Sequence, residues 1–310
     1  MKLLIEARGK VMKTALYQFL IPTLNNVNDI DITIESIYNQ NFDKDRLFVM
    51  VLDFGSTDGT YEKLINYKYN SLGIYRSYKT CNKRQMNSEM LSIIEKFRSE
   101  YVDPFYYTFM YPGDEVYPDY LNTCDRVIHE HENVSNIICE ADIFDRSHKK
   151  IGQRRLYDKM RIINGNKQAI EYINKGFDHQ IQCMSRKIPY GNNQVFFEMN
   201  EQRWWNKCLK TNMNTTAIYI EKALCCQKAV EYEDELEEIL FRWGSIIKQQ
   251  RHDRAEVMAL SNECYEEAFK QIARYALWRG ALYKYEKPRM AEDCVLLSEV
   301  IYPGIKNSSV

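Results

Sequence analysis

The chain of 310 residues is short of glycine and proline, with 12 glycines and 7 prolines. So small a share excludes a collagen-like, linker-like or low-complexity protein. The chain also lacks an excess of charge of either sign, because 42 lysines and arginines face 43 aspartates and glutamates. A protein that binds nucleic acid is expected to carry a basic excess, so we predict no nucleic-acid partner.

Long apolar runs and paired cysteine motifs are also missing. The longest apolar run, residues 47–52, is far shorter than the ~18 residues that span a bilayer. The opening MKLLIEARGKVMK interrupts its apolar residues with Glu6 and is not typical of a signal peptide. Nine cysteines, an odd number without CxxC spacing, argue against a disulfide framework. These absences predict a cytoplasmic protein without a transmembrane segment, and they leave open peripheral contact with the inner face of a membrane.

What the sequence does contain is an alternation of apolar runs and amphipathic stretches. Apolar runs predict buried strands at residues 15–21, 47–52, 74–78, 105–111 and 136–141, and Pro22 is expected to end the first of them. Apolar residues at helical spacing predict helices at 29–39, around 86–97 and at 118–131. Strands that alternate with helices in this way are typical of βαβ units. We therefore predict an α/β fold with a mostly parallel central sheet flanked by helices.

The pattern changes after residue 145. Residues 146–220 are irregular and rich in Asn, Gln, Lys and Arg, and apolar residues recur at helical spacing from residue 231 until just before Pro288. We predict four parts, an N-terminal extension at 1–14, an α/β domain at 15–145, an irregular part at 146–220 and a helical C-terminal region at 221–310. The C-terminal helices are expected to pack on a core, and a role in forming a homo-oligomer stays open.

Polar loops marked by glycine or proline follow three of the predicted strands. They contain IPTLNN (21–26), DFGSTDGT (53–60) and YPGDEVYPDYL (111–121). Ligands of parallel sheets bind at the carboxyl ends of the strands, so these loops are expected to line one crevice. The sequence has no GxGxxG, Walker A, GxSxG or HExxH motif, and the corresponding enzyme classes therefore have no support.

The motifs IPTLNN, LDFGSTDGT and FMYPGDEVYPDYL, in this order and at this separation, resemble those of the family 2 glycosyltransferases. The likeness covers roughly residues 16–125 and includes ESIYNQ at 35–40. Members of this family are inverting nucleotide-sugar transferases with the A-type fold. The resemblance implies a donor-binding sheet at 15–145 and an acceptor-binding part at 146–220. It also implies transfer from a nucleotide sugar, in the first place a UDP-sugar, to a glycan, a lipid-linked saccharide or a glycoprotein.

The resemblance also implies a donor-binding site at the strand ends. Its residues come from the three loops and from a following basic stretch, KRQMN, and are Pro22, Thr23, Asn25, Asp53, Gly55, Ser56, Arg84, Asn87 and Gly113. Asp53 would accept hydrogen bonds from the uracil ring or the ribose hydroxyls. Asp58 would cap the helix that follows. An ordinary strand–turn–helix connection would also explain residues 53–60, but the IPTLNN loop in register favours the binding site.

Two departures from the family pattern concern the metal and the catalytic base. A diphosphate leaving group calls for a divalent cation, Mg²⁺ or Mn²⁺, which the family holds on an Asp-x-Asp type of motif. Here residues 111–113 are Tyr-Pro-Gly, so the implied metal ligand is Asp114, unless that residue only holds the turn. For the base, Glu201 matches the family's Glu-Asp pair, Gln202 stands in place of its Asp, and Glu198 is the alternative base. These departures leave open a catalytically decayed relative that serves as a binding or partner subunit.

Overall fold

The computed structural model describes residues 17–77, 106–145, 147–164, 183–186, 215–228, 262–285 and 287–307, with single positions between 236 and 247. The predicted extension at 1–14 and the predicted helix around 86–97 lie outside these residues. The chain divides into two compact units, of which unit 1 comprises residues 1–165, 178–199 and 211–229, and unit 2 the rest. Each unit is described by itself.

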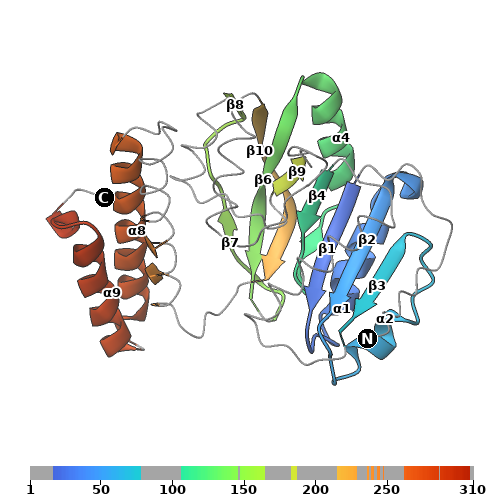
Figure 1. Ribbon diagram of the computed structural model, residues 1–310, viewed down its shortest axis with the longest axis horizontal. Helices are drawn as coiled ribbons and strands as arrows, with labels where there is room; N and C mark the ends of the chain where they lie inside the picture. The colour runs from blue at the N-terminus through green and yellow to red at the C-terminus, as the bar shows by residue number, and fades with distance from the viewer. Residues whose placement is uncertain are drawn as a thin grey trace. The chain divides into compact units, whose positions relative to one another are not determined.

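The N-terminal half of the unit 1 sheet is parallel (Figure 1). Its strands, in the order β3-β2-β1-β4, are β1 (Tyr17–Thr23), β2 (Leu47–Asp53), β3 (Leu72–Arg76) and β4 (Tyr106–Phe109). Every residue of β1 is buried, Gln18 and Thr23 included, as expected for a mostly apolar strand in a parallel sheet covered on both faces. The predicted runs therefore do form the buried strands of an α/β sheet.

The expected end of the first strand at Pro22 is wrong by two residues. β1 continues to Thr23, and Pro22 pairs with Leu52 on β2. On the other side, the pairing with β4 ends at Leu20. The missing N–H of Pro22 therefore interrupts no ladder with β4, and the strand tolerates the proline.

Beyond β4 the sheet is mixed. β9 (Cys183–Arg186) runs antiparallel between β4 and β6 (Val134–Phe144), and β10 (Thr216–Lys228) runs parallel to β6. Three further strands add antiparallel pairings, β5 (Glu115–Val116), β7 (Lys150–Arg154) and β8 (Arg161–Asn164). The stretch 146–220, expected to be irregular, thus contributes strands to the sheet, and the expected boundary at residue 220 falls inside β10.

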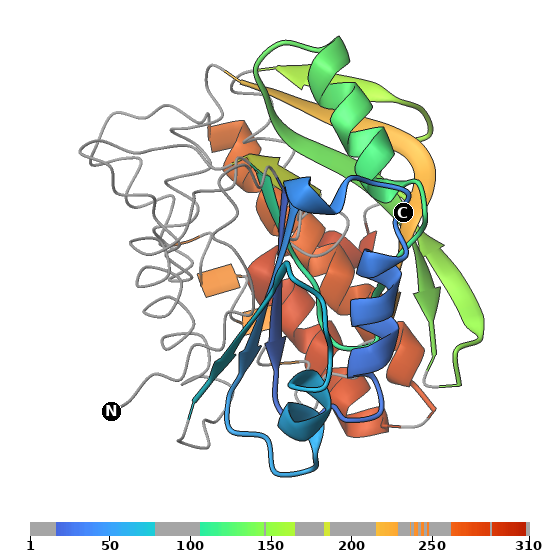
Figure 2. The ribbon, with the colours of Figure 1, turned by 90° about the vertical axis from the view of Figure 1, so that its right-hand side faces the viewer.

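Three helices cover one face of this sheet (Figure 2). They are α1 (Ile30–Tyr38), α2 (Thr60–Leu64) and α4 (Tyr120–Glu130), and a short 3-10 turn, η1 (Lys44–Arg46), precedes β2. The isoleucines at positions 30, 34 and 37 are fully buried on α1, where helical spacing predicts one apolar stripe. They join the core cluster that contains alternate residues of β1 and β2. This packing fixes the start of α1 directly behind the loop that follows β1.

Unit 2 contains a helical hairpin. Its elements are α8 (Asn262–Tyr283), α9 (Pro288–Ile301) and the 3-10 turn η2 (Ile305–Asn307). Pro288, expected to follow the end of a helix, is also the first residue of α9, a position where its missing N–H costs nothing. None of the helices within the described residues is long and apolar enough to cross a bilayer.

Candidate functional site

The first two polar loops meet at the carboxyl ends of β1 and β2, where Thr23 lies beside Asp53. The backbone N–H of Asn25 donates to Ser56 Oγ at 2.9 Å, and the N–H of Thr57 donates back to Asn25 Oδ1 at 2.9 Å. Asn25 has a φ of +56°, a left-handed conformation that asparagine adopts more readily than most residues. The predicted donor-binding residues Thr23, Asn25, Asp53 and Ser56 are therefore brought together by the fold.

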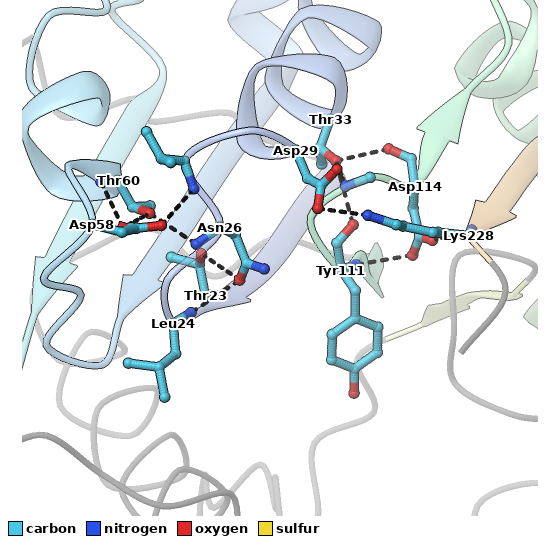
Figure 3. A network of polar contacts seen from close by, with 12 residues as sticks. Thr23, Leu24, Asn26, Asp29, Thr33, Asp58, Thr60, Tyr111, Asp114 and Lys228 are labelled. Atoms are coloured by element: carbon cyan, nitrogen blue, oxygen red, sulfur yellow. Dashed lines mark hydrogen bonds and ion pairs between the residues drawn. The ribbon is translucent and has the colours of Figure 1, made fainter. Parts of the chain in front are cut away.

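Asp58 joins the same two loops to the start of α2 (Figure 3). Its carboxylate accepts the N–H of Thr60, the first residue of α2, at 3.0 Å, and the N–H of Val27 at 3.0 Å. Although slight burial acts to raise it, the pKa of Asp58 is lowered by hydrogen bonds from the Thr60 hydroxyl and from the N–H groups of Val27 and Thr60. The N–H of Asn26 donates to Thr60 Oγ1 at 2.9 Å. The N-cap of α2 is Gly59, so Asp58 is not the capping residue that the sequence predicted; it supports the helix start from one residue earlier and also holds the first loop in place.

Asp53 is a buried carboxylate with an incomplete set of partners. It has 0% exposed surface, and its Oδ1 accepts the N–H of Ser56 at 3.2 Å. Its Oδ2 has no hydrogen-bond donor among the described residues. Burial raises the pKa of Asp53, against the effects of Ser56 and the nearby Arg76. A buried acceptor without a donor is costly, so this oxygen is suited to a hydrogen-bond donor on a ligand.

Arg76 is a site residue that sequence reasoning missed. It ends β3 in register with Asp53, and its Nε lies 3.6 Å from Asp53 Oδ2. Its Nη2 donates to the Ser56 carbonyl at 3.3 Å, and its guanidinium lies 4.0 Å from the ring centre of Tyr61. The sequence signal was weak, because a single arginine at the end of a strand that lacks strong apolar character is common on protein surfaces.

The third loop forms a tight turn at residues 111–114 (Figure 3). The Asp114 N–H donates to the Tyr111 carbonyl at 2.9 Å, and Asp114 Oδ2 accepts the Tyr111 N–H at 2.9 Å. Asp114 Oδ1 accepts the backbone N–H of Lys228, at the end of β10, at 3.1 Å. The Asp114 side chain is only 4% exposed, and burial raises its pKa to about 6.

Thr33 on α1 fixes this turn from behind. Its hydroxyl donates to the Asp114 carbonyl at 2.8 Å and accepts the N–H of Gly113 at 2.9 Å. Gly113 has a φ of +97°, which a residue with a Cβ rarely adopts. The turn is therefore held by a helix, a strand end and its own carboxylate.

The donor set at this turn does not fit a divalent cation. Both carboxylate oxygens of Asp114 already accept backbone N–H groups, and the side chain is buried. Within the described residues there is also no group of three or more His, Cys, Asp or Glu side chains arranged to hold a metal ion. The geometry suits the alternative named for Asp114, that of holding the turn.

Lys228 and Asp29 are two further residues at the turn that the sequence did not suggest. The Lys228 ammonium lies 2.6 Å from Asp29 Oδ2, and Asp29 directly precedes α1 (Figure 3). The Lys228 side chain packs closely against Gly113, so that a Cβ built on that glycine would lie 2.8 Å from Lys228 Cδ. Lys228 follows the predicted irregular part and belongs to no motif, so only the fold brings it here.

The remaining site predictions fall in two groups. Pro22 is buried in β1, and Gly55 lies in the second loop with a φ of +86°. Residues assigned by the resemblance to the donor and to the catalytic base lie outside the described residues, namely Arg84, Asn87, Glu198 and Glu201. The structure therefore assembles the strand-end part of the predicted site.

No family model matches the sequence, and no curated protein matches it. Among solved structures, residues 1–349 of S. aureus TarS in complex with UDP-GlcNAc match with a TM-score of 0.52 at 14% identity, over 94% of this chain and 90% of that one. A mannosyltransferase from Pyrobaculum calidifontis, in complex with GDP-Man and Mn²⁺, matches with a TM-score of 0.54 at 14% identity, over 96% and 88%.

The fold is that of the A-type glycosyltransferases. The A-type architecture that the sequence motifs implied is thereby confirmed. The chain spans about half of the longer TarS structure, 55% of its length. At such low identity the likeness concerns the fold, and the activity has to be argued from the site.

Proposed function

We propose that the chain transfers a sugar from a nucleotide-sugar donor, in the first place a UDP-sugar, to a hydroxyl group of a saccharide acceptor. The observation that carries the proposal is the buried Asp53 oxygen without a donor, placed at the carboxyl end of β2 in an A-type sheet. The similar folds of the TarS and mannosyltransferase structures, which are complexes with UDP-GlcNAc and GDP-Man, support it.

In this proposal the strand ends bind the nucleoside part of the donor. Asp53 Oδ2 accepts a hydrogen bond from the base or from a ribose hydroxyl, and Arg76 beside it opposes the effect of burial on the pKa of this carboxyl group. The first loop, pinned to the second through Asn25 and Ser56, forms the adjoining wall. The polar contacts are thus held in place before the ligand arrives, which lowers the cost of ordering on binding.

The reaction we infer is a direct displacement with inversion, as in family 2. The acceptor oxygen forms a bond to the anomeric carbon, and the bond from that carbon to the diphosphate oxygen breaks. The electron pair of that bond leaves with the nucleoside diphosphate. The hydroxyl proton passes to a carboxylate, for which the resemblance offers Glu201 or Glu198. The acceptor would be a glycan, a lipid-linked saccharide or a glycoprotein bound mainly by residues 146–220.

The test is a binding and release experiment on the full chain. UDP and GDP affinities are measured by calorimetry, and release of the nucleoside diphosphate is followed over a panel of nucleotide sugars. We expect Asp53→Asn to weaken UDP binding by about tenfold, the worth of one hydrogen bond to a charged group. The matched control is Asp45→Asn, an exposed position in η1, before the other end of β2. Equal affinities of the two variants would contradict the proposed role of Asp53.

A second function, nucleotide binding without transfer, is favoured by one observation. Tyr111 and Gly113 stand where the family pattern has acids, and the turn they form is closed by backbone contacts. A decayed relative of this kind would bind UDP in the calorimeter and release none from any nucleotide sugar in the panel.

A further inference from the structure

The space beside Gly113 is filled by another side chain. A Cβ at this position would lie 2.8 Å from Lys228 Cδ, 3.6 Å from Lys228 Cβ and 3.7 Å from Asp29 Cβ. A contact below 3.0 Å requires a shift, which the flexible lysine stem can make, and the φ of +97° at Gly113 is the stronger reason why this position favours glycine. Where the motif resemblance would place an acid, the turn therefore has a glycine with the stem of Lys228 packed beside it.

The neighbouring acid does not take over the missing role. Asp114 uses Oδ1 to accept the N–H of Lys228 and Oδ2 to accept the N–H of Tyr111. A carboxylate that binds a metal offers its oxygens toward the ligand site, whereas these two oxygens are turned into the protein. An amine thus lies beside the turn at a position where the motif resemblance would place a second carboxylate.

The amine lies at the sheet edge where the other predicted site residues lie. Lys228 ends β10, which is parallel to β6, and the close-up in Figure 3 shows it at the turn with Asp29 and Tyr111. Its side chain is 28% exposed, and its ammonium pairs with Asp29 Oδ2 at 2.6 Å. An ammonium has three donors, so the pair with Asp29 holds it in place while leaving it able to bind an anion.

We propose that Lys228 supplies the positive charge that binds the diphosphate of the donor, and that nucleotide binding by this chain does not require a divalent cation. This inference rests on the proposed function. Lysine is a common phosphate ligand because its ammonium is a compact point charge. The ligand class is therefore a nucleoside diphosphate, with Lys228 bound to its phosphate oxygens and Asp53 bound to its nucleoside part.

The test compares UDP with uridine, which has no phosphate. Affinities are measured for the full chain by calorimetry for UDP and by ligand-observed NMR for uridine, in EDTA and in Mn²⁺. The central variant is Lys228→Met, which keeps the stem over Gly113 and removes the charge. Lys228→Arg keeps the charge, and Lys222→Gln is a matched control on the same strand, 55% exposed and paired with Asp119. Thermal melting establishes that each variant is folded.

We expect the UDP affinity to be the same in EDTA and in Mn²⁺. Lys228→Met should weaken UDP binding by about tenfold, as for the loss of one charge-assisted contact. Uridine binding should not change in this variant, Lys228→Arg should retain most of the UDP affinity, and Lys222→Gln should bind as the wild type does.

Three results would overturn the inference. UDP binding that disappears in EDTA and returns with Mn²⁺ would restore the metal site and leave the proposed function standing. An equal loss of UDP and uridine affinity in Lys228→Met would show that the lysine is structural. No UDP binding in either condition would overturn both the inference and the proposed function.

Discussion

The hydroxyl of Thr33 offers the sharpest test of how the turn at 111–114 is held. We consider Thr33→Val, which replaces the hydroxyl by a methyl group of nearly the same size and leaves the packing of α1 intact. The hydroxyl makes two buried contacts, donating to the Asp114 carbonyl at 2.8 Å and accepting the Gly113 N–H at 2.9 Å. In the valine variant both backbone groups lose this partner.

The expected magnitude follows from these two contacts. A buried polar group left without a partner costs about 1–3 kcal/mol, so two such groups should lower the free energy of unfolding by about 3 kcal/mol. Thr33→Ser is the matched control, because it keeps the hydroxyl and removes only a buried methyl group, at a cost of about 1 kcal/mol. The two variants should therefore differ by about 2 kcal/mol, with valine the less stable.

The assay is hydrogen exchange of the full chain, read by mass spectrometry on peptides from 106–116. Local opening of the turn should speed exchange in this segment in Thr33→Val and much less in Thr33→Ser, and urea unfolding gives the matching free energies. If the valine variant is as stable as the serine variant and exchanges at the same rate, the hydroxyl does not hold the turn. The account of Asp114 as part of a preformed turn would then fail as well.

Three further predictions address charge and packing. Because the pKa of Asp114 is raised from 3.8 to about 6, the folded state keeps a proton that the unfolded state loses between these pH values. The free energy of unfolding of the wild type should therefore fall by at most about 3 kcal/mol as the pH rises from about 4 to about 7. Urea unfolding checks this, with Asp114→Asn as the reference that cannot titrate. Arg76→Gln removes the positive charge that lowers the pKa of Asp53 against the effect of burial. The UDP affinity of this variant, measured by calorimetry, should drop by about tenfold, and more at low pH. Gly280→Val should lower the free energy of unfolding of the helical hairpin by about 2 kcal/mol, and with it the melting temperature, because a Cβ there would lie only 3.0 Å from the Ala291 carbonyl oxygen. An unchanged melting temperature would contradict the close packing of α8 on α9.

The parallel half of the fold could be predicted from the sequence because its signal is local. The run at 47–52 is apolar at every position and the run at 15–21 at every position but Gln18, as is typical of strands buried on both faces, and the 29–39 stripe repeats at helical spacing. The strands in 146–220 carry no such signal. β7 and β8 are mostly exposed and polar, and they form because β6 and β10 offer them edges to pair with.

The same contrast between local sequence signals and long-range pairing applies to the candidate site. Loops at the ends of β1 and β2 were predictable, since the motif and the register place Thr23 beside Asp53. Arg76 and Lys228 were not, because each is one charged residue at the end of a strand without a motif. Long-range pairing alone brings Arg76 beside Asp53, and only the fold brings Lys228 to the turn at 111–114.

Asp114 shows why a motif position is not by itself a chemical role. In the sequence it is the acid that remains in a loop where acids are expected, so the metal was assigned to it. The contact that favours a structural role for Asp114 comes from Lys228, 114 positions along the chain, whose N–H donates to one carboxylate oxygen and whose stem packs beside Gly113. In the proposed arrangement a glycine and a distant lysine take the place of a cation at the turn, a substitution of charge that no local pattern could reveal. If nucleotide binding is independent of metal, the departures at 111–113 mark a changed means of holding the diphosphate rather than the loss of the site.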